Sequence, residues 1–310
     1  MTSKKSHPFP YVSIIVPVYN DQEHIGLLIE SLLNQDYPQK RTEIIIVDNN
    51  SRDKTPEIIR KFPVTLLCEN DVQSSYAARN RGIKKARGQI LAFIDSDCRA
   101  DPNWLTQGVK KLLDESADLV AGEVAFTFSR KKTLAEMYDS VTNFSFENYV
   151  NRGVSGAGNL FVKSQLFQQI GLFPARVKSG GDLQWTQKAT NRGFSLVYAP
   201  RAIVKHPARP LKPLLAKQFR VGAGHIDIFL RQGQSRARIL RNFLGSIKPS
   251  TVSSIKKRVE QRGTDDMKNK IYCLWCIGWL CKLAGAAGMI RPLLRLLIQP
   301  KPDLTNKQSN

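Results

Sequence analysis

The N-terminal two-thirds of the chain alternates short apolar runs with amphipathic segments. Apolar runs predict strands over residues 12–19, 43–48, 64–69, 89–95 and 118–126. Apolar residues spaced three or four apart predict helices over residues 21–35, 54–62, 74–88 and 102–115. Nearly continuous apolar strands that alternate with helices are typical of a mostly parallel sheet with helices on both faces. The pattern therefore predicts an α/β fold.

The pattern loosens over residues 127–157, and strand and helix signals return over 156–173 and 180–206. Further on, residues 271–290 are apolar apart from Lys282. Their length just suffices to cross a hydrocarbon core of roughly 30 Å, although a central lysine costs about 2.5–3.5 kcal/mol on insertion. A spanning or re-entrant helix, a helix lying in the membrane interface and a buried helix of a soluble protein all remain open.

Positive charge is concentrated in one part of the chain. The net charge is +21, yet residues 1–204 carry 26 basic and 21 acidic side chains. Residues 205–262 carry 14 basic side chains and 2 acidic ones. Such a segment fits an anionic membrane surface, or a solvated basic face. Zinc-ligand spacing and an RNP-like aromatic pattern are both missing from the sequence, so we predict no nucleic-acid partner.

These signals predict four segments along the chain. They are an N-terminal tail (1–10), a catalytic domain (11–207), a basic helical region (208–265) and a hydrophobic membrane-associating segment with a tail (266–310). The N-terminus lacks an apolar secretory core, which predicts a cytoplasmic catalytic domain. Cys273 and Cys276 form a CxxC pair without a second pair or a histidine cluster, so no metal site is predicted there.

Polar side chains follow several of the predicted strands. Asp48 ends one strand, and Asp95 and Asp97 end another. Ligands of parallel sheets bind at the carboxyl ends of the strands. Two carboxylates two residues apart on extended backbone point the same way, and Mg²⁺ typically binds one or two carboxylates together with substrate phosphates. Arg79, on the intervening helix, can reach a phosphate. The sequence lacks both GxGxxG after the first strand and a P-loop, which disfavours those nucleotide folds.

An ordered series of motifs, rather than any single one, resembles a known family. In chain order, the motifs are "VSIIVPVYN", "IIIVDNNSRDKT", "AARNRGIKKARGQILAFIDSD", "GNLFVKSQLFQQIGLF", "GGDLQW" and "AIVKH". Together they resemble the family 2 glycosyltransferases of the GT-A fold, over about residues 11–207. The resemblance implies a nucleotide-sugar donor (UDP-, GDP- or dTDP-linked), a divalent metal (Mn or Mg) and transfer with inversion.

The resemblance also implies roles for individual residues on the donor side. Pro17 and Tyr19 match positions that frame the nucleobase, and Asp48 matches the carboxylate that bonds it. Arg79 matches an arginine near the base and the phosphates. Asp95 and Asp97 match the DxD motif, in which Asp97 is the expected direct metal ligand. Asn49 and Asn50 replace the second acid and the glycine of the usual "VDDGS", a departure at the turn after Asp48.

On the acceptor side, Asp182 of "GGDLQW" matches the acidic half of the family's "ED", and Gly181 replaces the glutamate. The implied role of Asp182 is to take the proton from the acceptor hydroxyl. A residue at a helix start can also serve only as a cap. His206 either approaches the metal or is a structural histidine, and Trp185 either stacks on a sugar or packs in the core.

The sequence therefore predicts an inverting, metal-dependent glycosyltransferase at the cytoplasmic face of a membrane. Its acceptor would be a glycan or a lipid-linked sugar in cell-surface polysaccharide or glycolipid synthesis. "KQFRVGAGH" (217–225) lacks the tryptophan of the QxxRW motif of processive synthases, so we expect single additions. The alternatives are a sugar-nucleotide nucleotidyltransferase, a non-catalytic nucleotide-sugar-binding module and, less compatible with Asp48 and Arg79, a two-carboxylate glycoside hydrolase.

Overall fold

The computed structural model describes residues 9–177, 179–231 and 233–298, and the chain divides into two compact units. One unit comprises residues 1–132 and 142–208, and the other comprises residues 133–141 and 209–310. The boundaries of these units differ from those of the predicted segments. The second unit takes a stretch from inside the predicted catalytic domain and is not divided at residue 265.

The first unit is built on a mixed, mostly parallel sheet with the strand order β3-β2-β1-β4-β7-β6-β8-β5. The strands are β1 (Val12–Val18), β2 (Thr42–Asp48), β3 (Thr65–Cys68), β4 (Ile90–Ile94), β5 (Arg99–Ala100), β6 (Leu119–Thr127), β7 (Asn159–Lys163) and β8 (Leu196–Pro207). The first four along the chain pair in parallel, as do β6 and β8. Strand β7 lies antiparallel between β4 and β6, and β5 lies antiparallel to β8. The predicted α/β fold is confirmed.

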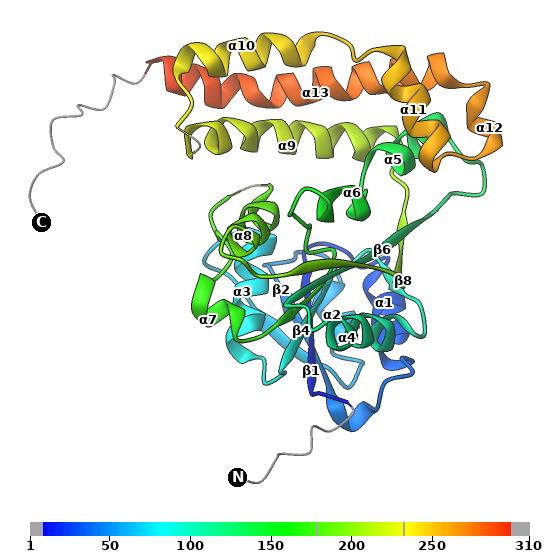
Figure 1. Cartoon of the computed structure of the whole chain (residues 1–310), viewed down its shortest axis with the longest axis vertical. Helices are drawn as coiled ribbons and strands as arrows, with labels where there is room; N and C mark the ends of the chain where they lie inside the picture. The colour runs from blue at the N-terminus through cyan, green and yellow to red at the C-terminus, as the bar shows by residue number, and fades with distance from the viewer. Residues whose placement is uncertain (1–8, 178, 232, 299–310) are drawn as a thin grey trace, which may run out of the picture. The chain divides into compact units, whose positions relative to one another are not determined.

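Helices cover both faces of this sheet (Figure 1). They are α1 (Ile25–Leu33), α2 (Thr55–Ile59), α3 (Ser75–Lys85), α4 (Trp104–Asp114), α6 (Phe146–Val150), α7 (Leu166–Ile170) and α8 (Gly181–Thr190), with a 3₁₀ turn at Gln39–Arg41. Adjacent residues of a strand face opposite sides. Ile14 accordingly packs in the cluster that contains residues of α1 and α4, whereas Ile15 packs with α7 and α8.

The antiparallel strand β7 is held in place by a buried asparagine. The Asn159 side chain donates to the carbonyl oxygens of Glu123 and Ala202 at 2.8 and 2.9 Å and accepts from Trp104 Nε1 at 2.8 Å. Because every polar atom of this fully buried amide is paired, it ties β7 to β6 and β8 without leaving an unsatisfied group. The strand's N-terminal end is thereby fixed beside the end of β4.

The second unit is helical. It contains α9 (Leu211–Arg231), α10 (Arg236–Ile247), α11 (Val252–Arg262), α12 (Asp265–Lys268) and α13 (Ile271–Ile298), together with most of α5 (Leu134–Thr142). Among the described residues, α13 is the one helix long and apolar enough to cross a membrane. A Cβ on Gly222 would overlap the carbonyl oxygen of Gly285, which shows that the backbones of α9 and α13 are in close contact.

Candidate active site

The carboxyl ends of β1 and β2 place three of the predicted residues together. Val18 lies opposite Asp48 in the register of the two strands, and Pro17 lies opposite Val47. Pro17 is buried within β1, whereas Tyr19, just beyond the strand, is 48% exposed. An exposed aromatic ring that follows a strand paired with β2 is suited to stacking on a planar base.

Asp48 carries a carboxylate that is buried at the end of β2. The residue is 4% exposed, and its Oδ2 accepts from the Ser51 backbone N–H at 3.2 Å. Within the described part of the chain, Oδ1 has no hydrogen-bond partner. A buried acceptor left unpaired costs about 1–3 kcal/mol. The carboxylate is therefore prepared to accept a hydrogen bond from a ligand.

The two asparagines that depart from the family pattern have structural reasons. The Asn49 amide donates to the carbonyl oxygens of Glu69 and Val72 at 2.8 and 3.0 Å and accepts from the Ser74 N–H at 2.6 Å. An aspartate could not make those two donations. Asn50 has φ 68°, in the left-handed region that asparagine tolerates better than most residues. The amide of Asn49 and the left-handed backbone of Asn50 thus form the turn after Asp48.

Arg79 lies against the first acid of the DxD motif. Its Nη2 contacts Asp95 Oδ1 at 2.5 Å, and its side chain is 5% exposed. The guanidinium also lies over the Tyr76 ring, 5.8 Å from the ring centroid. A buried arginine of this kind needs a carboxylate partner. Arg79 therefore orients Asp95, and its own path to a phosphate remains a prediction.

The second acid of the motif faces a buried histidine. Asp97 Oδ2 lies 3.3 Å from His206 Nε2, and His206 Nδ1 lies 2.6 Å from the carbonyl oxygen of Pro207. The contact with this carbonyl requires a proton on Nδ1, so Nε2 is the ring nitrogen that faces Asp97. Histidines that bind metals are oriented by this kind of second hydrogen bond. The pair therefore fits a shared cation.

A metal held here would depend on its ligand for further coordination. No group of three or more His, Cys, Asp or Glu residues is arranged to hold an ion among the residues that the structure describes. Mg²⁺ and similar hard cations commonly bind one or two carboxylates and complete their shell with water and substrate phosphates. The donors at Asp97 and His206 suit a metal that arrives with a diphosphate.

The middle residue of the DxD motif is tied to a contact that sequence reasoning missed. Ser96 Oγ donates to Asp21 Oδ2 at 2.6 Å, and Asp21 Oδ1 lies 2.6 Å from His24 Nδ1. The Asp21 carbonyl oxygen also accepts the N–H groups of His24 and Ile25. Residues 22–24 form this turn, and α1 begins after it at Ile25 rather than at residue 21 as predicted.

Asp182 is held by three hydrogen bonds in the first turn of α8. Its Oδ1 accepts from the Tyr76 hydroxyl at 3.1 Å and from the Leu183 N–H at 3.0 Å, and its Oδ2 accepts from the Ala157 N–H at 2.8 Å. The N-cap of α8 is Gly180, so Asp182 does not occupy the capping position that the alternative interpretation required. Burial, followed by the Asp182 charge, raises the pKa of the Tyr76 phenol, which keeps it protonated as a donor.

The short segment Gly156–Gly158 lies between Asp95 of the DxD motif and Asp182. A Cβ on Gly158 would lie 2.8 Å from Asp95 Oδ2, and a Cβ on Gly156 would lie 3.4 Å from Asp182 Oδ2. Ala157, between them, donates to Asp182. The turn that precedes β7 thus brings Asp95 of the DxD motif and Asp182 to neighbouring positions.

The absence of the family's glutamate at residue 181 follows from packing. A Cβ on Gly181 would lie 2.7 Å from Val177 Cγ2 and 3.0 Å from Tyr76 Cε2. Tyr76 occupies this space while it donates to Asp182. Trp185, the second uncertain residue of the motif, is 2% exposed, donates to the Gly171 carbonyl at 2.6 Å and stacks on Phe167. It is a core residue and not a sugar platform.

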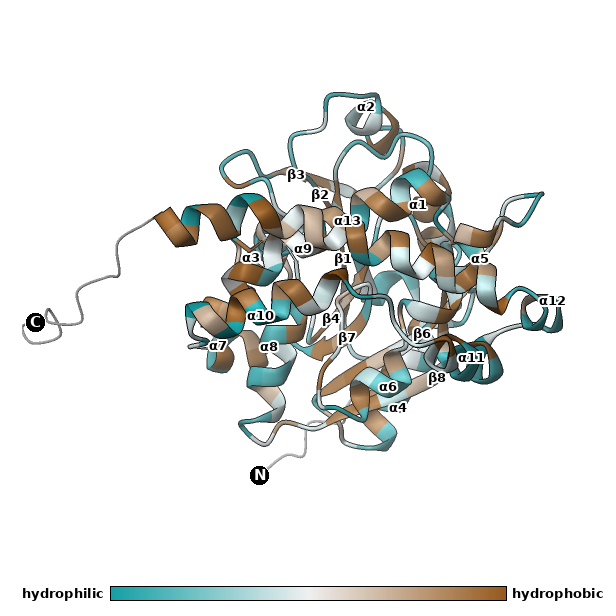
Figure 2. Ribbon diagram, turned by 90° about the horizontal axis from the view of Figure 1, so that it is seen from above, coloured by the Kyte–Doolittle hydropathy of each residue, from teal (hydrophilic) through white to brown (hydrophobic). Residues whose placement is uncertain are grey.

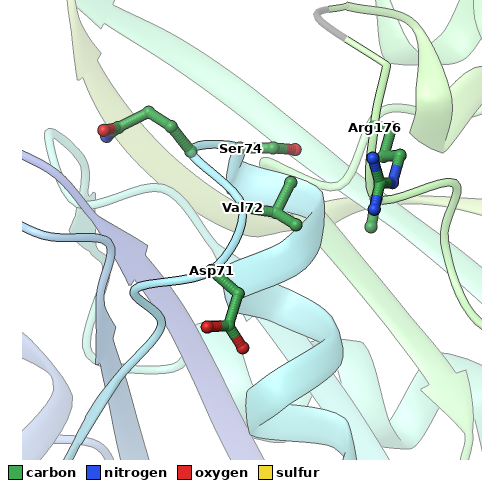
Figure 3. Close-up of a pocket in the computed structure, with 6 residues that line it drawn as sticks. Asp71, Val72, Ser74 and Arg176 are labelled. Carbon is green, nitrogen blue, oxygen red and sulfur yellow. The ribbon is translucent and has the colours of Figure 1, made fainter.

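A pocket of about 270 Å³ opens at the start of α3 (Figure 3). One wall is the loop before α3, with Asp71, Val72 and Ser74, and the other carries Arg176. The first wall is tied to the donor-side turn, because Ser74 N–H donates to Asn49. The second wall belongs to the loop that leads to α8. The sequence contained no signal for this pocket.

Comparisons with known proteins give the class. The family model described as Glycosyl transferase family 2 matches residues 13–165. Glycosyltransferase AglE of Haloferax volcanii is 38% identical over 295 residues, which cover 92% of this chain and 97% of that protein. A Methanococcus voltae dolichyl N-acetyl-α-D-glucosaminyl phosphate 3-β-D-2,3-diacetamido-2,3-dideoxy-β-D-glucuronosyltransferase is 29% identical, with 72% and 75% of the two chains covered.

Two solved structures share the fold. The mannosyltransferase PcManGT of Pyrobaculum calidifontis, in complex with GDP-Man and Mn²⁺, has a TM-score of 0.56 and 20% identity, with 93% of this chain and 78% of that chain covered. Staphylococcus aureus TarS in complex with UDP-GlcNAc has a TM-score of 0.53 and 16% identity, with coverage of 91% and 92%.

The chain belongs to glycosyl transferase family 2. It is a glycosyltransferase that uses a nucleotide-sugar donor, and its fold is of the GT-A type. The predicted family, fold and enzyme class are confirmed. Family membership decides against the nucleotidyltransferase, the glycoside hydrolase and the non-catalytic module.

Proposed function

We propose that this enzyme transfers a sugar with inversion, in a metal-dependent reaction, from a nucleotide donor to a glycan or a lipid-linked acceptor at the cytoplasmic face of a membrane. The observation that carries the proposal is the segment Gly156–Gly158, which contacts Asp95 on one side and Asp182 on the other. A base for the acceptor and the acids of the DxD motif are thereby adjacent across one piece of backbone.

On the donor side, Asp48 accepts from the nucleobase through its unpaired Oδ1, and Tyr19 stacks on the base beside Pro17. Asp97 and His206 would hold Mn²⁺ or Mg²⁺, with Asp95 oriented by Arg79. When bound, the cation neutralises charge that develops on the leaving diphosphate. Arg79 adds fixed positive charge near the same group.

On the acceptor side, Asp182 removes the proton from the attacking hydroxyl. The Tyr76 hydroxyl and the Ala157 N–H hold its carboxylate in one orientation. A single base that directs the acceptor oxygen to the face opposite the leaving group produces inversion by one in-line displacement.

The acceptor class is supported by relatives. The Methanococcus voltae relative is named for transfer to a dolichyl phosphate-linked sugar, and a Bacillus spizizenii relative, 28% identical over 193 residues, is named a poly(ribitol-phosphate) β-glucosyltransferase. Both names describe glycoconjugates. We therefore propose a lipid-linked sugar or a polymer as the acceptor.

The test is donor binding by calorimetry with UDP-, GDP- and dTDP-sugars, with and without Mn²⁺. We expect one nucleotide class to bind in a metal-dependent way and Asp97→Ala to abolish that binding. Asp182→Asn should bind the donor normally but fail to transfer, and Asp114→Asn, on the exposed end of α4, should do both normally. Metal-independent binding, or transfer by Asp182→Asn at the wild-type rate, contradicts the assignment. The anomeric configuration of the product, measured by NMR, tests inversion.

A further inference from the structure

The exposed face of α13 is apolar along the full helix. Of its solvent-exposed residues, only Arg291 and Arg295 are charged; the others are Tyr272, Cys273, Cys276, Trp279, Leu280, Ala287, Ile290, Leu294, Leu297 and Ile298. At 100° per residue these ten positions fall within a stripe about 120° wide. The exposed face of a helix in a soluble protein is normally polar. This stripe is therefore built to meet an apolar medium or a partner.

The opposite face of α13 is packed against its own unit. Leu274 clusters with Ile255 and Val259 of α11, and Met289 and Leu293 cluster with Ile239 of α10. Helix α9 approaches the backbone of α13 at Gly285 and Gly288. The helix is thus covered by protein along one side and open along the other, an arrangement that a lone spanning segment does not have.

Spanning would require the covering helices to enter the hydrocarbon with α13. Helix α9 contains Lys217 and Arg220, and α10 contains Arg236, Arg238 and Arg241. Charged side chains are expensive in the middle of a bilayer and tolerable at its surface, where long side chains reach the headgroups. The charges of the neighbours therefore favour a helix that lies along the surface.

Helix α10 adds a second exposed apolar stripe. Leu240, Leu244 and Ile247 are exposed and spaced i, i+4, i+7, and the helix contains no acidic residue. Trp279 Nε1 donates to the carbonyl oxygen of Ile247 at 3.1 Å, so the end of α10 lies beside the exposed face of α13. Figure 2 shows the hydrophobic positions recurring along both helices. Basic amphipathic helices with tryptophan are typical of the membrane interface.

Charge identifies which partner fits the two stripes. Residues 209–298 carry 18 Lys or Arg and 4 Asp or Glu, and Arg238, Arg241, Arg291 and Arg295 are exposed next to the apolar positions. A second copy of this chain would bring the same positive charge to the contact and repel it. An anionic bilayer offers hydrocarbon to the leucines and phosphates to the arginines.

We propose that α13 and α10 lie in the interface of an anionic phospholipid bilayer, with their exposed stripes inserted, and that α13 does not span it. This deepens the membrane-face part of the proposed function. The tests below measure binding to lipid vesicles without a sugar donor. A failure of membrane binding can therefore be distinguished from a failure of donor binding. The enzyme is then held on the surface where a lipid-linked acceptor would be presented.

Native cysteines supply the first test. Cys273 and Cys276 are exposed in the α13 stripe, and Cys68 is exposed in the first unit. We expect phosphatidylglycerol-containing vesicles to protect Cys273 and Cys276 from a water-soluble maleimide while Cys68 stays reactive, as read by mass spectrometry of the full chain. Vesicles of phosphatidylcholine alone should protect far less. Equal labelling with and without anionic vesicles overturns the proposal.

Co-flotation with the same vesicles tests the two stripes separately from the charge. Leu244→Glu with Leu294→Glu, and Arg238→Gln with Arg241→Gln, should each weaken partitioning at least tenfold, the second pair with a reduced salt dependence. Leu113→Glu, at an exposed leucine of α4, is the matched control and should float like the wild type. Unchanged flotation of the Leu244/Leu294 double variant contradicts insertion.

Two alternative occupants give distinct results that would overturn the proposal. A covering second copy predicts protection of Cys273 and Cys276 that depends on protein concentration and not on lipid. A spanning helix predicts that the protein resists extraction from membranes by alkaline carbonate, and that Tyr272→Cys and Leu294→Cys become accessible from opposite sides of sealed vesicles. Extraction by carbonate is the expected outcome, with both introduced cysteines, like Cys273 and Cys276, protected from a water-soluble maleimide on either side.

Discussion

Replacing Asn49 with the aspartate usual in the family should destabilise this protein. The Asn49 side chain is 4% exposed and donates to the carbonyl oxygens of Glu69 and Val72. The Asn49→Asp variant would lose both donations and place a carboxylate against two carbonyl oxygens. Two lost hydrogen bonds and the accompanying desolvation correspond to about 2–4 kcal/mol. The aspartate of the family pattern is thus predicted to be unfavourable here.

The assay is thermal unfolding of the full chain, followed by circular dichroism. A loss of about 2–4 kcal/mol corresponds to roughly 4–16 °C in Tm for a unit of this size. The introduced carboxyl should have a pKa raised by burial. The destabilisation should therefore be small below about pH 4 and grow as pH rises through the folded-state pKa, since a protonated carboxyl regains one donor.

Asn103→Asp supplies the matched control. Asn103 is an exposed N-cap of α4 whose side chain makes no capping hydrogen bond, and aspartate is at least as good at that position. Its Tm should stay the same or rise slightly. An Asn49→Asp variant as stable as the wild type at neutral pH refutes the argument that the amide donors hold this loop.

Three further predictions concern packing and the acceptor side. Tyr76→Phe removes the donor to Asp182 and should lower kcat severalfold in a transfer assay while donor affinity by calorimetry is unchanged; equal kcat contradicts the role. Gly181→Glu should lose about 1–3 kcal/mol in urea unfolding because Tyr76 and Val177 fill the space; wild-type stability contradicts this. Gly222→Ala should lower Tm because the added Cβ would meet the backbone of α13. Gly245→Ala, in open space on α10, should instead raise stability by about 0.5–1 kcal/mol. Equal changes in stability for the two variants contradict the close approach of α9 and α13.

Much of the first unit could be predicted because its signals are local. Apolar runs such as residues 12–19 and 89–95 became β1 and β4 with ends shifted by one residue. The antiparallel placement of β7 could not be predicted, because it depends on pairings with β4 and β6 that are distant in sequence. Residues 127–157, where the pattern loosened, contain the short helices α5 and α6.

Some residues of the candidate site could likewise be predicted from the sequence, and others could not. Asp48, Asp95 and Asp97 stand out because acids at strand ends interrupt the apolar pattern, whereas Asp182 was indicated by the resemblance of "GGDLQW" to the family motif. The hydroxyl of Tyr76 and the carboxylate of Asp21 gave no such signal. Their importance arises from partners 106 and 75 residues away, which sequence spacing does not encode.

The sequence by itself determined the class of protein and the α/β fold and singled out the acidic residues of the candidate site, because periodicity and short motifs are local properties. Only the tertiary structure decided which of these acids lie together, why Asn49 and Gly181 depart from the family pattern, and that α13 is covered on one face and apolar on the other. Those are properties of packing between distant segments, and a one-dimensional pattern contains no record of which surfaces meet.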